Sequence, residues 1–238
     1  MNQNTKPDSR LTIIEIFPTS LARISSLAHP ILLLSAYVAQ FSYLVVDPLQ
    51  ALLNFLFPLT IIQIAYVAVC LPIAGFSSPS ATPSKSRARS VVKSKKPVKS
   101  PSQALTVFIA LILSGIAVPV LTAIQILLGA PFTSHLPLTI LSSTHLSLLS
   151  LFPLIYVHGT DSEKWKQILS VYCPLDEVYG ASIGAFIGGW LGAIPIPLDW
   201  DREWQKWPIT IVTGIYLGYT IGKFVGGKVF KGKMIELE

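Results

Sequence analysis

The chain has 238 residues, of which 51% are hydrophobic and 13% charged, with a net charge of +6. Soluble globular proteins carry nearer a quarter charged residues, so this composition excludes an ordinary soluble domain. Three long stretches contain no Asp, Glu, Lys or Arg, namely Pro48–Ser84, Ser100–Thr160 and Val178–Leu198.

These stretches predict an all-α, multi-pass transmembrane helical bundle that forms a single membrane domain over residues 1–238. A bilayer core about 30 Å thick needs about 20 apolar residues of helix to cross it, and each stretch is long enough for one or two crossings. Proline and glycine positions divide the chain into about six spans. We expect them at residues 27–46, 49–76, 103–128, 137–157, 177–196 and 207–226.

Residues 77–102 form a basic segment of Ser, Pro and Lys that contains no aromatic residue. Such a composition cannot bury a core, so we expect a disordered loop. With six spans, this loop lies on the same side as both termini and the loop after span four. These segments, with Lys223 counted in the C-terminal tail, together hold 16 of the 18 basic residues. The positive-inside rule therefore predicts cytosolic N- and C-termini. It also accounts for the net charge without nucleic-acid binding, which would favour basic residues interleaved with aromatics.

An ionisable side chain is predicted at membrane depth in span four, where His145 lies among serines and a threonine. Such groups are candidates for function. His145 is thus a possible contact for a lipid headgroup or a partner helix. The alternative is a histidine that hydrogen-bonds to serines of its own bundle.

Spans five and six carry glycine at every fourth position, which makes a smooth groove along one helix face. Lipid provides no hydrophobic drive for helix association, so close backbone approach must supply it. The two grooves predict an antiparallel hairpin with the helices packed groove to groove. The alternative is that one groove seats a helix of a different protein. The glycines are Gly180, Gly184, Gly188, Gly192, Gly214, Gly218, Gly222 and Gly226.

The connection between these spans is rich in tryptophan and charge. Its tryptophans suit the boundary between water and lipid. Asp199 and Asp201 lie beside Arg202, which favours an Arg-paired turn over a metal site. Metal-assisted phosphoryl transfer needs several ligands held in one cavity, and no spacing of that kind is present in the non-cytosolic loops. We therefore predict no catalytic residue, no metal and no cofactor.

The segment Gly188–Ile209 reads Gly-Gly-Trp-Leu-Gly-Ala-Ile-Pro-Ile-Pro-Leu-Asp-Trp-Asp-Arg-Glu-Trp-Gln-Lys-Trp-Pro-Ile. It resembles the hallmark of the PIG-F family of glycosylphosphatidylinositol (GPI) anchor biosynthesis, and the basic, Ser-rich loop is similar to that of fungal members. The close match covers about residues 174–227. The first four spans resemble the family only in number and hydrophobicity.

The resemblance implies an accessory subunit in the endoplasmic reticulum membrane that stabilises the multi-pass catalytic subunits of GPI ethanolamine phosphate transferase. Those partners transfer phosphoethanolamine from phosphatidylethanolamine to mannoses of the GPI precursor. The alternative is a protein that binds or presents one of these lipids. Carried over by position, the family motif and the expected partner-docking residues are Pro197, Asp199, Trp200, Asp201, Arg202, Trp204, Gln205 and Trp207.

Overall fold

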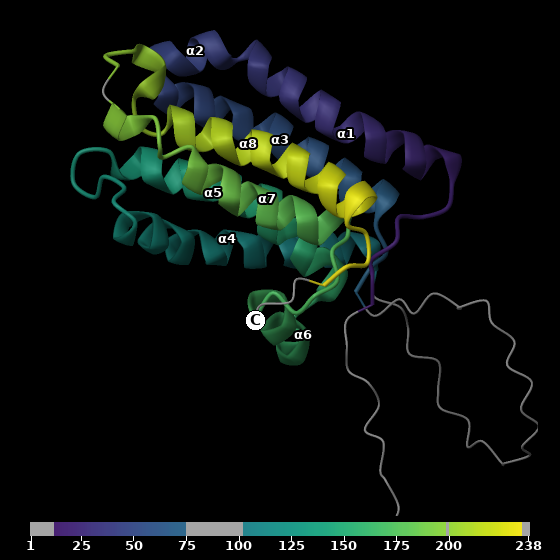
Figure 1. Ribbon diagram of the computed structural model, residues 1–238. Coiled ribbons are helices and arrows are strands. Elements are labelled where there is room, and N and C mark those ends of the chain that lie inside the picture. Colours follow the sequence, from purple (N-terminus) through teal and green to yellow (C-terminus); the bar gives the residue numbers. More distant parts are fainter. Residues whose placement is uncertain (1–11, 75–101, 199, 235–238) are drawn as a thin grey trace, which may run out of the picture.

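The computed structural model describes residues 12–74, 102–198 and 200–234 (Figure 1). All regular elements within these residues are helical, and six helices are long and apolar enough to cross a membrane, as predicted. The main helices are α1 (Ser20–Ala39), α2 (Phe41–Val46), α3 (Pro48–Cys70), α4 (Gln103–Leu127), α5 (Leu136–His158), α6 (Ser162–Leu169), α7 (Glu177–Leu191) and α8 (Ile209–Phe224). Two 3-10 turns, η1 (Ile196–Leu198) and η2 (Glu203–Gln205), lie between α7 and α8, and a π-helical turn, η3 (Val225–Val229), follows α8.

The first two predicted spans differ from the helices in their bounds, and so does the fifth, whose helix α7 ends at Leu191 rather than at residue 196. The first helix begins at Ser20 rather than Leu27, because the side chain of Thr19 caps it by accepting from the Ala22 N–H at 3.2 Å. It ends at Ala39, and the short helix α2 covers the rest of the predicted span up to Val46. The helix of the second span ends at Cys70 rather than at residue 76. The basic segment predicted at 77–102 lies outside the described residues except for Ser102.

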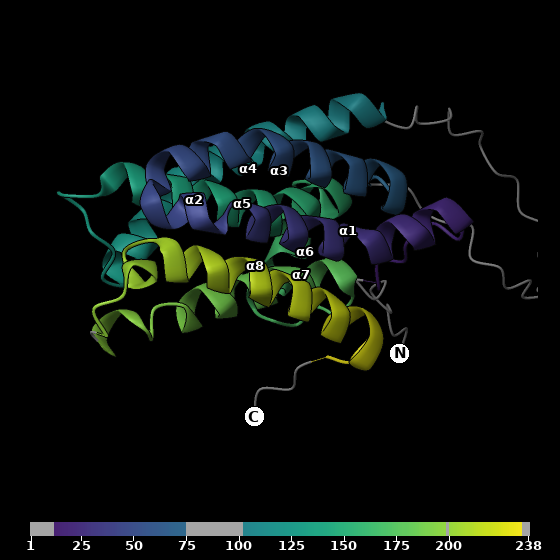
Figure 2. The ribbon, with the colours of Figure 1, turned by 90° about the horizontal axis from the view of Figure 1, so that it is seen from above.

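Helix α5 forms the centre of the bundle and is the most completely buried of the six long helices. It packs against α3, α4, α7 and α8, while α1 packs mainly on α3 and α8 (Figures 1 and 2). Serine hydroxyls link α5 to its neighbours. Ser147 of α5 donates to the Ser114 carbonyl of α4 at 2.6 Å, and Ser182 of α7 donates to the Ser150 carbonyl of α5 at 2.8 Å. Hydrogen bonds of this kind join helices where water is absent.

The bundle has two distinct ends. We call the end that carries α6 and the described chain ends at residues 12 and 234 the terminal end (Figure 1). Backbone hydrogen bonds tie its segments together, from the Phe17 N–H to the Cys70 carbonyl and from the Leu175 N–H to the Lys233 carbonyl. The opposite end, which we call the turn end, carries the connections 40–47, 128–135 and 192–208.

Candidate interaction site

Helices α7 and α8 lie side by side along their whole length (Figures 1 and 2). Their glycines face each other in antiparallel register. A methyl group added to Gly184 would lie 2.8 Å from the Cα of Gly222, and one added to Gly188 would lie 2.8 Å from the Cα of Gly218. Real side chains essentially never approach backbone this closely, so the two backbones are in direct contact.

The same register extends to both ends of the hairpin. A methyl group on Gly226 would lie 2.8 Å from the Cα of Gly180, and one on Gly214 would lie 3.2 Å from the Cα of Gly192. All eight glycines singled out in the sequence therefore lie in one seam between α7 and α8. The turn that joins the two helices therefore starts and ends at helix ends that this seam holds close together.

The connection between the hairpin helices is folded around the side chain of Gln205. Its Nε2 donates to the Pro195 carbonyl at 2.8 Å, and its Oε1 accepts from the Arg202 N–H at 3.1 Å. Gln205 is itself buried. Although the family motif includes this residue, its amide braces the turn from within and faces the protein.

Replacing Gln205 with alanine should open the turn. The Pro195 carbonyl and the Arg202 N–H lose their partner, and an unsatisfied buried polar group costs about 1–3 kcal/mol. We expect faster amide exchange over residues 200–207, measured by hydrogen–deuterium exchange mass spectrometry. The matched control is Lys206→Ala, because Lys206 pairs with the exposed Glu203 in the same turn. Equal exchange in both variants would show that Gln205 does not brace the turn.

The three tryptophans of the turn occupy two different environments. Trp200 and Trp204 are exposed, by 54% and 36%, and their ring centroids lie 5.9 Å apart. Trp207 instead packs against the apolar core, and its indole N–H is enclosed with no hydrogen-bond partner in the described part of the chain. The tryptophan pair Trp200–Trp204 is therefore the aromatic surface that the turn presents.

The remaining motif residues surround this pair. Pro197 lies in η1, and its neighbour Ile196 is partly exposed. Asp201 and Arg202 are exposed, and Asp201 adopts a positive φ of 50°, in the left-handed region that Asp tolerates better than most residues. Asp199 lies outside the described residues, so the expected pairing of Arg202 with it is not described.

His145 lies in the interior of the bundle and is fully buried. Its Nδ1 is 2.7 Å from the Tyr216 hydroxyl and its Nε2 is 3.1 Å from the Leu52 carbonyl oxygen. Tyr216 in turn stacks on Tyr37, whose hydroxyl is 2.8 Å from that of Thr213. Among the described residues, the partners of His145 are thus a tyrosine of α8 and the backbone of α3, and not the serines of the bundle.

A buried ionic cluster, which sequence reasoning missed, joins four helices near the terminal end. Lys223 of α8 is 5% exposed, and its Nζ lies 3.5 Å from Glu177 Oε2 and 3.5 Å from the centre of the Tyr66 ring. Ser26 of α1 donates to the same Glu177 oxygen at 2.6 Å, and His29 stacks on Tyr66. The sequence offered one signal, the charged residue at the outer end of each hairpin helix, but Lys223 was counted with the basic C-terminal tail.

Asp176 fixes the start of α7 at the same end. It accepts hydrogen bonds from the N–H groups of Ile14, Val178 and Tyr179 at 2.8–3.0 Å. Burial raises the pKa of Asp176, and these three hydrogen bonds oppose the rise. The residue caps the helix and ties the N-terminal segment to the hairpin.

Known proteins include a family and several relatives that this chain resembles. The GPI biosynthesis protein family Pig-F matches residues 28–227. The glycosylphosphatidylinositol anchor biosynthesis protein 11 of Neurospora crassa is 42% identical over 220 residues, covering 92% of this chain and 80% of that protein. The protein of the same name from Aspergillus fumigatus is 40% identical, with 89% and 81% covered. No solved structure matches.

A human relative carries a more specific name. The GPI ethanolamine phosphate transferase, stabilizing subunit, of Homo sapiens is 35% identical over 103 residues, covering 42% of this chain and 47% of that protein. The match to the family begins in α1 and includes all six long helices, so the resemblance extends well beyond residues 174–227. The chain belongs to the Pig-F family of GPI biosynthesis proteins.

Proposed function

We propose that this chain is a non-catalytic stabilising subunit of a GPI ethanolamine phosphate transferase in the endoplasmic reticulum membrane. It supports transfer of phosphoethanolamine from phosphatidylethanolamine to mannoses of the GPI precursor. The observation that carries the proposal is family membership together with the name of the human relative, a stabilizing subunit of that transferase. The basic residues of the terminal end favour its placement in the cytosol, with the turn end toward the lumen.

The tryptophan pair Trp200–Trp204 is the proposed docking surface for the multi-pass catalytic subunit. Tryptophan is among the residues that dominate interface energies, since a large rigid ring buries much area at low entropic cost. The pair is exposed, while Gln205 and Trp207 beside it are directed inward and hold the turn in one shape. A preorganised surface loses little entropy on binding.

The assignment of the catalytic centre to a partner rests on the name of the human relative, a stabilizing subunit. Metal-assisted phosphoryl transfer needs several Asp or His ligands around one cavity. Over residues 12–74, 102–198 and 200–234 the structure has no group of three or more His, Cys, Asp and Glu side chains that could hold a metal.

A double variant, Trp200→Ala with Trp204→Ala, tests the docking surface. An interface tryptophan at a hot spot contributes about 2 kcal/mol or more, so we expect at least tenfold less transferase to copurify with the variant in mild detergent. Transfer activity per mole of retained transferase should stay unchanged, because no catalytic group is removed. Both quantities are measured by quantitative immunoblotting and a phosphoethanolamine transfer assay.

The matched control is Phe57→Ala, which removes an aromatic ring that is 75% exposed on α3. It should retain the transferase in full. Undiminished copurification with the double tryptophan variant would rule out docking through this pair. Full retention with lower activity per transferase would instead indicate that the turn takes part in the chemistry.

A further inference from the structure

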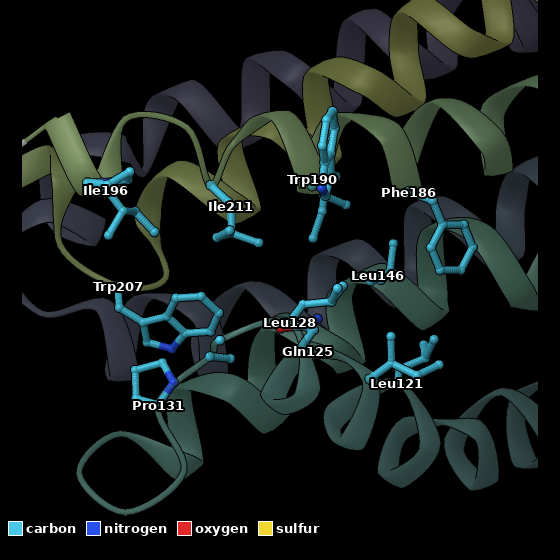
Figure 3. A pocket seen from close by; sticks show the side chains of 17 residues that line it. Leu121, Gln125, Leu128, Pro131, Leu146, Phe186, Trp190, Ile196, Trp207 and Ile211 are labelled. Carbon is cyan, nitrogen blue, oxygen red and sulfur yellow. The ribbon is translucent and has the colours of Figure 1, made fainter.

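The structure contains a cavity of about 390 Å³ between α4 and α7, near the turn end (Figure 3). Leu121, Gln125 and Leu128 line it from α4, and Phe186 and Trp190 line it from α7. Leu146 of α5 lies between these two sides, and Pro131, Ile196 and Trp207 close the turn end.

The packing of the helices explains why the cavity exists. Helix α4 packs against α5, while α7 packs against α8 and on another side of α5. Helices α4 and α7 therefore both pack on α5 and are separated from each other along this stretch. Leu128 and Trp190 lie at the rim of the cavity, at the ends of membrane-spanning helices, and their side chains are 72% and 66% exposed. The cavity thus opens sideways toward the lipid.

The lining changes in polarity along the cavity. Its middle is apolar, with Leu121, Leu146, Phe186 and Ile215. At the turn end, the amide of Gln125 and the indole N–H of Trp207 are enclosed in the wall, and neither has a hydrogen-bond partner among the residues that the structure describes. Leaving such groups unpaired in an apolar medium is costly, so they favour an occupant that carries an acceptor at this end.

We propose that this cavity binds an acyl chain of a membrane glycerophospholipid, with the ester group of that chain at Gln125 and Trp207. The chain fills the apolar part, and the ester carbonyl accepts from the indole N–H and the amide. Tryptophan side chains commonly lie at this depth, where the ester region of the bilayer begins. Because the amide of Gln125 is enclosed, a neighbouring side chain such as the exposed Leu128 must shift as the ester enters.

An acyl chain is far thinner than a helix about 10 Å wide, and it comes from the lipid that surrounds these helices. The inference concerns the chain by itself and does not depend on the proposed role in the transferase.

The test uses the full chain in nanodiscs that contain a phospholipid with a photoreactive diazirine in one acyl chain. Phosphatidylcholine and phosphatidylethanolamine probes are used separately, because the cavity contacts the chain and ester and not the headgroup. After illumination, labelled residues are mapped by mass spectrometry. We expect labelling at Leu128 and Trp190 about tenfold above that at Ile116 and Phe57, which are similarly exposed outside the cavity, a preference of about 1.4 kcal/mol.

Two variants and one control sharpen the result. Ala193→Phe fills the cavity and should abolish the enrichment, whereas Ala123→Phe on the exposed face of α4 should leave it intact. Gln125→Leu removes an unpaired buried amide without loss of packing, so it should fold normally and still lower the enrichment. It serves as the second test if Ala193→Phe does not fold.

Three outcomes would overturn the proposal. The first is equal labelling of Leu128, Trp190 and the two reference positions with both probes. The second is enrichment that survives both Ala193→Phe and Gln125→Leu. The third is loss of the label from Leu128 and Trp190, with labelling of partner peptides in its place, when the chain is probed in the transferase complex, which would show that a partner side chain occupies the cavity.

Discussion

Replacing Gly188 with leucine should lower the melting temperature of the purified chain by about 10 °C. A methyl group at this position already lies 2.8 Å from the Cα of Gly218, and backbone cannot rotate away as a side chain can. Helices α7 and α8 would have to separate, which breaks the neighbouring glycine contacts as well. Overpacking of this kind costs about 3 kcal/mol, and each kcal/mol lowers the melting temperature of a chain this long by about 2–4 °C.

The measurement is thermal unfolding in detergent, followed by size-exclusion chromatography after heating. Gly218→Leu, at the facing position, should give the same loss. Gly115→Leu is the control, because a methyl group on Gly115 of α4 meets no atom within 4 Å. There the better helix propensity of leucine should leave stability unchanged or slightly higher. A similar loss in all three variants would show that close approach of α7 and α8 is not the cause.

Breaking the buried ionic cluster should produce the second large effect. Lys223→Met leaves the Glu177 carboxylate with the Ser26 hydroxyl, and Glu177→Gln leaves the buried Lys223 cation with the Tyr66 ring in place of an opposite charge. Removing one member of a buried pair costs about 3 kcal/mol. We expect each single variant to unfold at a clearly lower temperature, measured as above.

The double variant Lys223→Met with Glu177→Gln separates pairing from packing. If the pair is coupled, the double variant should be more stable than the sum of the two single losses predicts, by about 0.5–3 kcal/mol. Lys166→Met is the control, because Lys166 and its partner Glu163 are 72% and 67% exposed. That variant should unfold with the parent chain. Strictly additive losses in the cycle would show that the two residues act independently.

The glycine spacing predicts how two helices pack against each other, as well as predicting that each segment is a helix. Four glycines at intervals of four in each of two successive spans predict a seam on each helix, and a short connection predicts that the helices are antiparallel. The register could not be predicted, because any shift by four residues keeps glycine against glycine. It follows from the turn, where Gln205 sets how residues 195–205 fold and therefore where α8 begins.

The orientation of the tryptophan side chains and the burial of Lys223 could not be predicted from the sequence either. The sequence places three tryptophans in one short connection, yet only the folded turn directs Trp207 inward and leaves Trp200 and Trp204 outside. Lys223 follows an apolar span and was counted with the basic tail. Its burial depends on Glu177, which is 46 residues away in sequence and is brought beside it by the hairpin.

The sequence by itself determined the class of protein, the number of spanning helices and the family motif, because long charge-free stretches and a rare string of residues are local properties. Which helix lies at the centre was decided only by the tertiary structure. Helix α4 is the most apolar and lies at the edge, whereas the serine-rich α5 is buried. In a membrane, apolar surface gains little by leaving lipid, so the polar side chains that need partners occupy the interior, and their partners come from distant parts of the chain.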